Sequence, residues 1–268
     1  IIFQLSMSVS IYFAQQNEPE TDDLADSFIN LENDLVSQLN NLNYGPNVEY
    51  IYSPLDYASN LHKAFLTKFL LTKKKVLFLG INPGPWGMCQ TGIPFGEVNI
   101  VRDYLKVDGE VKTPTNYHPQ RPVNGLNCHR SEVSGKRLWD LFVELSEGDP
   151  YKFFKDCFIY NYFPLALMNK NAKNITPGDL KSEFQKKLQE ICDKSLSDIV
   201  TLLQTDTIVA IGKYAEKRSI EVVKKFKLNN IKVIQIPHPS PRSVGTAEKW
   251  KNETLNQLKS YDILQLFK

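Results

Sequence analysis

The chain combines two patterns of hydrophobic and polar residues. Short apolar runs bounded by lysine, glycine or proline are typical of buried strands, and they lie at 75–79, 157–161 and 207–211. The segment 231–236 reads as another strand, although it contains a lysine and a glutamine. Apolar residues that recur every three or four positions predict helices over 24–42, 61–71, 135–147, 177–203, 214–225 and 247–258. Because strands and helices alternate, the pattern predicts a three-layer α/β fold, with a mostly parallel central sheet of about four strands flanked by helices.

Charge is distributed unevenly along the chain. The first 40 residues contain seven acids and no lysine or arginine, so the rest holds all 32 basic residues but only 23 of the 30 acids. We therefore predict a loose acidic amino-terminal segment at 1–23 and a single α/β domain at 24–268. The basic excess of the domain favours a polyanionic partner, with a solvated lysine-rich surface as the open alternative.

Membrane and metal-binding patterns are absent from the sequence. No apolar run is long enough to span a bilayer. The cysteines form no C-x-x-C pair and have no zinc-site spacing with histidine; they are Cys89, Cys128, Cys157 and Cys192. We therefore expect reduced thiols, no metal, no iron–sulfur cluster and no cofactor.

The loop at 80–97 carries most of the candidate chemistry. It follows a predicted strand, and its five glycines and three prolines hold the backbone open and let it approach a ligand. Asn82, Met88 and Phe95 offer a carboxamide, a thioether and an aromatic ring, a set that suits a planar, uncharged ligand that forms hydrogen bonds. Taken alone, Asn82 is also typical of a turn before proline, and Phe95 of a core aromatic.

A second candidate loop follows the last predicted strand. In Pro237-His238-Pro239-Ser240-Pro241-Arg242, three prolines in five residues stiffen the backbone and present His238 and Arg242 on a rigid turn. Asn82, Asn161 and His238 each lie at or just beyond the end of a predicted strand. Because ligands of parallel α/β sheets bind beyond the carboxyl ends of the strands, we expect these three side chains to meet in one crevice.

Five segments together resemble the single-strand-selective monofunctional uracil-DNA glycosylases, a branch of the uracil-DNA glycosylase superfamily. The segments are 80–103, 128–135, 161–164, 174–177 and 238–242. The resemblance implies an enzyme that hydrolyses the N-glycosidic bond of uracil, and of 5-modified uracils such as 5-hydroxymethyluracil, in single- and double-stranded DNA, leaving an abasic site. It also implies a nuclear monomer without metal or cofactor.

For catalysis, the resemblance implies that Asn82 positions the attacking water and that His238 donates a hydrogen bond to the O2 side of the departing uracil. An amide cannot remove a proton, so Asn82 orients the water without deprotonating it strongly. This is sufficient for an oxocarbenium-like sugar, which accepts a poor nucleophile, while the donor stabilises the uracil anion that leaves.

For base recognition, the resemblance implies that Phe95 stacks on the flipped uracil and that Asn161 reads its edge. The Asn161 carboxamide would accept N3–H and donate to O4, a pattern that cytosine reverses. Gly84 and Met88 would shape the wall near C5, where the glycine leaves space for a water that a hydroxymethyl group can replace. Ile81 completes the expected base-binding residues.

For DNA binding, two features offer contacts. Backbone N–H groups at the start of the helix near 135 suit a phosphate, and the candidates there are Ser131, Ser134, Gly135 and Lys136. The expected wedge, which fills the gap left by the flipped base, comprises Pro241, Arg242, Ser243, Val244 and Gly245. Other basic residues that could contact phosphates are Lys73, Lys74, Lys75, Arg102, Arg130 and Arg137. The chain departs from the family pattern at Trp86, Cys89 and 243–246.

Two other functions are alternatives to a glycosylase. A nucleotide-handling α/β hydrolase would need a glycine-rich phosphate loop with lysine, or paired acids for Mg²⁺, and the sequence contains neither pattern. A non-catalytic module that binds damaged DNA stays open, because the catalytic assignment rests on Asn82 and His238 alone.

Overall fold

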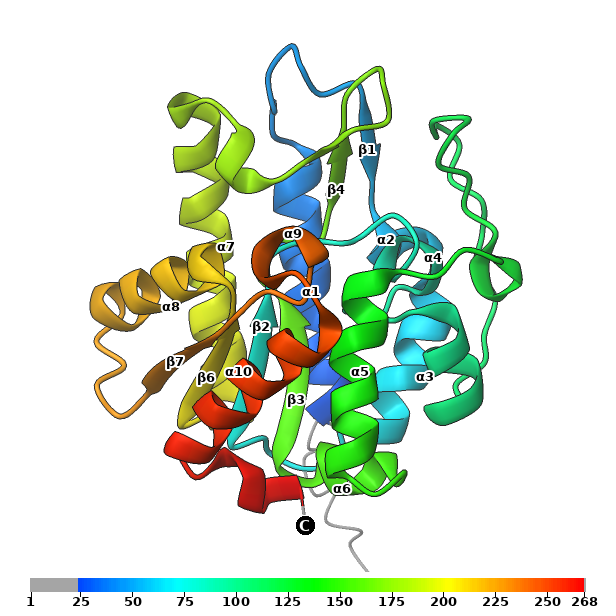
Figure 1. Ribbon diagram of the computed structural model, residues 1–268. Helices are drawn as coiled ribbons and strands as arrows, with labels where there is room; N and C mark the ends of the chain where they lie inside the picture. The colour runs from blue at the N-terminus through cyan, green and yellow to red at the C-terminus, as the bar shows by residue number, and fades with distance from the viewer. Residues whose placement is uncertain (1–23, 268) are drawn as a thin grey trace, which may run out of the picture.

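The computed structural model describes residues 24–267, so the predicted acidic segment at 1–23 lies outside the described residues. All four predicted strands pair in parallel, in the order β3-β2-β6-β7 (Figure 1). Their bounds are Val76–Gly80 for β2, Cys157–Asn161 for β3, Thr207–Ile211 for β6 and Lys232–Ile236 for β7. The prediction of a parallel four-stranded sheet is confirmed.

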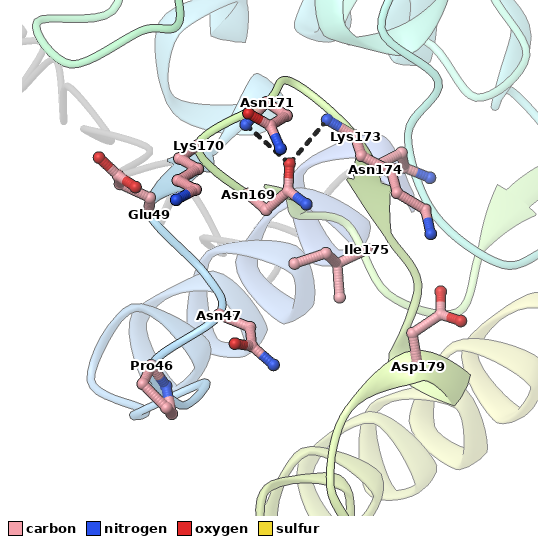
Figure 2. A pocket seen from close by; sticks show the side chains of 10 residues that line it. All are labelled: Pro46, Asn47, Glu49, Asn169, Lys170, Asn171, Lys173, Asn174, Ile175 and Asp179. Atoms are coloured by element: carbon pink, nitrogen blue, oxygen red, sulfur yellow. Dashed lines mark hydrogen bonds between the residues drawn. The ribbon is translucent and has the colours of Figure 1, made fainter.

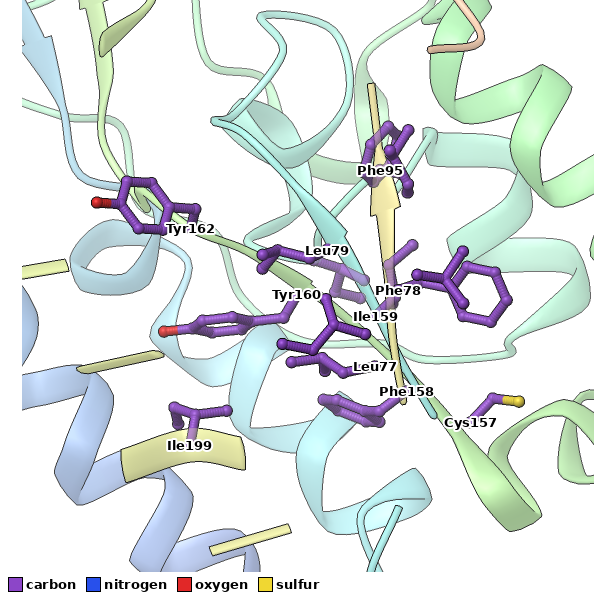
Figure 3. Close-up of a cluster of buried hydrophobic side chains, with 14 of the residues drawn as sticks. Leu77, Phe78, Leu79, Phe95, Cys157, Phe158, Ile159, Tyr160, Tyr162 and Ile199 are labelled. Carbon is purple, nitrogen blue, oxygen red and sulfur yellow. The ribbon is translucent and has the colours of Figure 1, made fainter. Parts of the chain in front are cut away.

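Helices cover both faces of this sheet because both faces are apolar. On one face, Phe28 of α1 (Leu24–Asn40) packs edge-on against Phe158 and Tyr160, with ring centroids 5.7 and 5.6 Å apart. On the other face, the ring centroid of Phe142 in α5 (Val133–Leu145) lies 4.8 Å from that of Phe78. Figure 3 shows Phe78 pointing away from Tyr160. The core therefore has the expected three layers.

The other predicted helices are also present. Helices with nearly the expected bounds are α3 (Ser59–Phe69), α8 (Lys213–Lys225) and α10 (Ala247–Ser260). Short helices that the pattern did not predict are α2 (Pro54–Tyr57), α4 (Met88–Thr91), α6 (Pro150–Asp156) and α9 (Pro241–Val244). Figure 1 shows α5 and α10 in front of the sheet and α1 behind it. Across residues 24–267, no helix has the length and apolar character that a membrane span requires.

The predicted helix at 177–203 is divided in the structure. A capping box between Thr176 and Asp179 starts only a single 3-10 turn, Pro177–Asp179. Leu180 and Lys181 are extended, with ψ of 153° and 149°, and α7 runs from Ser182 to Leu203. The predicted helix start was therefore wrong, because the Thr176 cap closes a turn that does not continue.

A second, antiparallel sheet was not predicted. It contains β1 (Tyr50–Tyr52), β4 (Ala166–Met168) and β5 (Asn174–Ile175), in the order β1-β4-β5. Strands of two or three residues are too short to show a period of two, so pattern analysis cannot detect them. This small sheet carries Asn174 to the candidate site.

The four cysteines are free and buried. Burial raises the pKa of Cys89, Cys157 and Cys192 well above the usual thiol range. These thiols are therefore kept protonated and behave as small apolar core residues.

Candidate active site

A cavity of about 240 Å³ lies beyond the carboxyl ends of β2, β3 and β7. Asn82, Asn161 and His238, which the sequence places after three separate strands, all line it. The other lining residues are Ile81, Pro83, Gly84, Pro85, Phe95, Glu132, Ser134, Asn174, Thr176 and Ser240. Pockets for drug-sized ligands measure roughly 300–1,000 Å³, so this cavity suits a single small ring system.

Gly80, the last residue of β2, lets two lining side chains approach the strand closely. A Cβ atom at this position would lie 2.3 Å from Asn161 Oδ1 and 2.5 Å from Phe95 Cε2. Any larger residue would displace both side chains. Gly80 had no predicted role, although a glycine that ends a buried strand beside candidate ligand-binding residues is a signal of close approach.

Asn161 presents an unused acceptor. Its side chain is buried, Nδ2 donates to Met88 Sδ over 3.2 Å, and Oδ1 has no hydrogen-bond partner among the described residues. A buried polar atom without a partner costs about 1–3 kcal/mol, so Oδ1 favours a ligand that brings an N–H donor. Met88 was expected to shape the cavity wall. It lies behind that wall instead, where it packs with Val36 and Leu55, and it is not among the residues that line the cavity.

His238 presents a donor whose position is fixed by the backbone. Its Nδ1 accepts the backbone N–H of Ser240 over 3.1 Å, so the proton of the neutral ring lies on Nε2. Burial lowers the pKa of His238, which favours the neutral ring. The site therefore holds a neutral N–H donor beside the unused acceptor of Asn161.

Asn82 is joined to a residue that sequence analysis gave no role. Its Nδ2 donates to Pro83 O and to Asn174 Oδ1, each over a long 3.4 Å. Neither bond uses Asn82 Oδ1, which can therefore accept a hydrogen bond from water. Asn174 was part of the matched segment 174–177, and this was the only sequence signal for it.

Phe95 has a backbone conformation that points to a local constraint. Its φ is +54°, in the left-handed region that residues other than glycine rarely adopt. The ring lies 6.4 Å from that of His238, centroid to centroid, and lines the cavity with Ile81 and Gly84. Gly135 supports this turn, because a Cβ there would lie 2.5 Å from Phe95 O.

The loop that carries His238 is anchored from two helices. Arg137 of α5 donates from Nη1 to Pro239 O (3.1 Å) and from Nη2 to Gly245 O (3.0 Å). Trp250 of α10 donates from Nε1 to Pro237 O over 2.8 Å. Arg137 was a candidate for phosphate contact, but both of its terminal nitrogens hold this loop.

The expected wedge forms the short helix α9, in which Pro241, Arg242 and Ser243 are exposed. Ser240 caps it by accepting the backbone N–H of Arg242 over 3.3 Å, and Gly245 ends it with φ of +78°. The helix contains Pro241, Arg242, Ser243 and Val244. These residues therefore lie directly beyond the loop that carries His238.

The other predicted DNA contacts lie around the start of α5, two residues earlier than expected. Ser134 is in the first turn and lines the cavity, and Ser131 is exposed just before the helix. Lys136 is exposed and forms an ion pair with Asp140 over 2.8 Å. Ser134 is therefore the member of this group that faces the cavity.

The lysines at 73–75 were also candidates for phosphate contact, and the structure places them at the amino end of β2, opposite the cavity. Lys74 is buried and donates from Nζ to Phe69 O over 2.9 Å. Lys75 forms an ion pair with Asp156 over 2.9 Å. These lysines therefore lie at the end of β2 opposite the cavity, about one strand length away from it.

A polar groove of about 420 Å³ adjoins the cavity, and Asn174 lines both. Part of the groove is lined by a turn that Figure 2 shows from close by. In this turn, Asn169 Oδ1 accepts the backbone N–H groups of Asn171 and Lys173, over 2.9 and 3.0 Å. The turn joins β4 to β5 and so fixes Lys173 and Asn174 beside the cavity.

Comparison with known proteins identifies the family. The model of the uracil DNA glycosylase superfamily matches residues 68–259. The chain belongs to this superfamily. Its relatives include the single-strand selective monofunctional uracil-DNA glycosylase of Rattus norvegicus, 41% identical over 249 residues, which cover 93% of this chain and 89% of that protein. The protein of the same name from Bos taurus is 41% identical over 244 residues, which cover 90% and 89% of the two chains.

A solved structure has the same fold. The crystal structure of wild-type SMUG2 from Pedobacter heparinus matches with a TM-score of 0.63 and 20% identity, over 88% of this chain and 98% of that one. The sequence relatives and this structure together confirm the resemblance and the fold that the sequence motifs implied.

In this member of the superfamily, Glu132 is a further cavity residue that sequence analysis did not assign. A Cβ on Gly84 would lie 2.1 Å from its Oε1, and a Cβ on Gly87 would lie 2.0 Å from its Oε2, so the carboxyl group packs directly on the two glycines. Its Oε2 is buried without a hydrogen-bond partner among the described residues. Burial, and secondarily the charge of Glu97, raises the pKa of Glu132 to about 7.

This raised pKa predicts a pH-dependent stability. The unfolded chain loses the Glu132 proton near the ordinary carboxyl pKa, whereas the folded chain keeps it up to a pH of about 7. Stability is therefore lost as pH rises between these two values. We expect Glu132→Gln, which cannot ionise, to raise the melting temperature at pH 8 relative to wild type, by about 2–4 °C for each kcal/mol gained, with little gain at pH 4.5.

Thermal unfolding followed by circular dichroism at pH 4.5, 6 and 8 measures this difference. Glu248→Gln removes an exposed carboxyl group from α10 and serves as the control, with a difference from wild type that does not grow with pH. An equal effect of Glu132→Gln at all three pH values would show that the carboxyl group ionises normally in the fold.

Proposed function

We propose that this chain is a monofunctional uracil-DNA glycosylase, which hydrolyses the bond between uracil and deoxyribose and leaves an abasic site. The observation that carries the proposal is the buried, unpartnered Oδ1 of Asn161, in a base-sized cavity that also holds the neutral N–H donor of His238. The relatives from Rattus norvegicus and Bos taurus carry names that state uracil-DNA glycosylase activity.

The cavity favours uracil because of the pattern of donors and acceptors on Asn161. Uracil offers the N3–H donor that Oδ1 lacks, and its O4 can accept the second N–H of the amide. Cytosine presents an acceptor at N3 and a donor at the 4-position, so it would leave both buried groups unpaired. Stacking on Phe95 would hold the ring in the cavity without distinguishing the two bases.

Hydrolysis is supported by where charge develops. As the glycosidic bond breaks, negative charge gathers on uracil, and the Nε2–H of His238 can donate to its O2 side. The sugar becomes oxocarbenium-like and is attacked by a water that Asn82 Oδ1 orients. A neutral histidine is sufficient, because it stabilises the leaving anion and need not transfer a proton.

Base release without strand cleavage follows from the residues that surround the cavity. Strand cleavage by a bifunctional glycosylase requires an amine that forms a Schiff base with the sugar. None of the described lining residues is a lysine. The proposed product is therefore an intact strand with an abasic site.

The finer parts of the proposal concern substrates and setting. The family resemblance supports 5-hydroxymethyluracil as a further proposed substrate, and the space beside Gly84 is occupied by the Glu132 carboxyl group. Both single- and double-stranded DNA are proposed to enter, and the enzyme is proposed to act as a nuclear monomer.

A single-stranded oligonucleotide with one uracil, incubated with the protein and then treated with alkali, tests the activity. A non-catalytic DNA-binding module would yield no alkali-labile site.

Asn161→Asp should exchange the base preference. An ionised aspartate repels O4 and the developing uracil anion, and a polar mismatch in a buried site costs about 1–3 kcal/mol, more when it is charged. We expect excision of uracil to fall by about fivefold or more, with weak excision of cytosine gained by the protonated form. Matched uracil and cytosine oligonucleotides measure this, with the exposed Asn252→Asp as control. Unchanged uracil excision would remove Asn161 from the base-reading role.

Asn82→Ala and His238→Ala should each lower the single-turnover rate by about 10²–10³-fold, because each removes a group that acts in the transition state. DNA affinity should change little, since neither residue is proposed to contact phosphate. The exposed His129→Ala provides the matched control. A double variant that still cleaves at the wild-type rate would show that catalysis resides elsewhere.

Gly80→Ala should impair excision although it adds only a methyl group. The new Cβ would lie 2.3 Å from Asn161 Oδ1, so the base-reading amide must move. Overpacking of this kind costs about 1–3 kcal/mol, and we expect a fall in rate of about fivefold or more together with a lower melting temperature. Gly178→Ala, where the nearest atom is 3.5 Å away, should change neither quantity. Normal excision by Gly80→Ala would show that the close approach is not required.

A further inference from the structure

A second cavity beside the active site has a strongly basic lining. It measures about 530 Å³ and is lined by Arg121, Ala172, Lys173, Asn174, Thr176, Asp179 and Arg242. Asn174 and Thr176 also line the active-site cavity, so the two cavities share a wall. On its other side it shares Lys173, Asn174 and Asp179 with the polar groove of Figure 2. We call it the basic cavity.

The charges of the basic cavity are not neutralised by ion pairs. Its three cations are Arg121, Lys173 and Arg242, and no ion pair joins any of them to a described residue. The opposing carboxylate is Asp179, whose Oδ2 accepts the backbone N–H and the hydroxyl of Thr176. A net positive charge therefore remains, and it comes from three segments that are distant in the sequence.

Arg121 is held in place before any ligand binds. Its backbone carbonyl accepts the hydroxyl of the buried Tyr52 over 2.8 Å, and its guanidinium carbon lies 5.3 Å from the ring centroid of Trp86. Arg130 lies 4.5 Å from the same ring, so Trp86 gathers two guanidinium groups at this edge.

One donor of Arg121 is unsatisfied. Nη1 donates to the neighbouring Gln120 O over 3.0 Å, but Nε is buried and has no acceptor among the described residues. Burial of an unpaired guanidinium donor is costly, and an anion in the cavity would supply the acceptor. The planar fork of a guanidinium suits the oxygens of a phosphate better than a single point charge does.

We propose that the basic cavity binds the phosphodiester next to the excised nucleotide, with Arg121 as its principal contact and Lys173 and Arg242 completing the charge. The proposal rests on the proposed glycosylase function, because it places the nucleotide's base in the active-site cavity. The shared wall of Asn174 and Thr176 then lies where the sugar leads to its neighbouring phosphate. The active site contributes uncharged groups that read the base, and the basic cavity contributes affinity for the strand.

The test uses single-stranded oligonucleotides with a 2′-fluorinated deoxyuridine, whose glycosidic bond resists cleavage. One linkage at a time, from two before to two after this nucleotide, is replaced by an uncharged methylphosphonate. With wild type, we expect one linkage adjacent to the nucleotide to lower affinity by about 10- to 100-fold when it is neutralised. With Arg121→Gln, affinity for unmodified DNA should fall by a similar factor, and neutralising that same linkage should have little further effect.

Two further variants keep the test decisive. Lys173→Gln changes an exposed side chain, so it is expected to fold normally and to give a smaller loss at the same linkage, even where Arg121→Gln is unstable. Lys224→Gln removes an exposed lysine at the end of α8 and is the matched control. Its effect on DNA affinity and the effect of neutralising any one linkage should simply add. Arg121→Gln should also reduce the slope of log affinity against log salt by about 0.7, the value for one phosphate contact on a single strand.

The outcomes separate this proposal from the proposed function. Losses that are additive at every linkage, or Arg121→Gln binding as tightly as Lys224→Gln, would overturn the basic cavity even if wild type excises uracil normally. A wild type that binds inorganic phosphate, but whose affinity for DNA does not depend on which linkage is neutralised, would overturn it too. The basic cavity would then be a site for free anions. A wild type that excises no uracil but shows the linkage effect would overturn the glycosylase proposal and leave the basic cavity supported.

Discussion

The close approach at Gly80 is the constraint on which the site depends. The absent side chain at the end of β2 lets Asn161 Oδ1 and Phe95 occupy space that a Cβ atom would contest at 2.3 and 2.5 Å. Phe95 takes a left-handed backbone conformation in this arrangement, and Gly135 packs against its carbonyl oxygen. One side of the cavity is therefore built by contacts with backbone that tolerate no added atom, and this rigidity is what the proposed base selection by a single amide requires.

The titratable groups of the active-site cavity favour their neutral forms. His238 has a lowered pKa because it is buried, and the Glu132 carboxyl has a raised pKa for the same reason. Asn82, Asn161 and the other lining side chains carry no charge. Such a cavity suits an uncharged base and directs an N–H donor at the place where negative charge would develop. The positive charge lies outside this cavity, in the basic cavity, where we propose that it binds a phosphate. The leaving base is then stabilised by hydrogen bonds from uncharged groups.

Much of this architecture was predictable from local patterns. Three of the four parallel strands, β2, β3 and β6, are buried on both faces and read as largely apolar runs, whereas β7 carries an exposed Lys232 and a partly buried Gln235. The positions of Asn82, Asn161 and His238 after three of the strands indicated one shared crevice. The small antiparallel sheet, the turn before α7 and the roles of Gly80, Asn174 and Glu132 were not predicted. The strands of the small sheet are too short to show a period of two. The turn before α7 and the roles of the three residues depend on which atoms lie within a few ångströms in the folded chain.

The sequence by itself determined the secondary structure of the core, the chemical types at the site and the family, because these depend on composition and order along the chain. The tertiary structure alone decided how individual side chains are used. Met88 packs behind the cavity wall, Arg137 holds the His238 loop, and Lys74 is buried at the opposite end of the sheet. It also brought Arg121, Lys173 and Arg242 around one cavity. No local pattern encodes these outcomes, because each depends on the spacing between segments far apart in the chain.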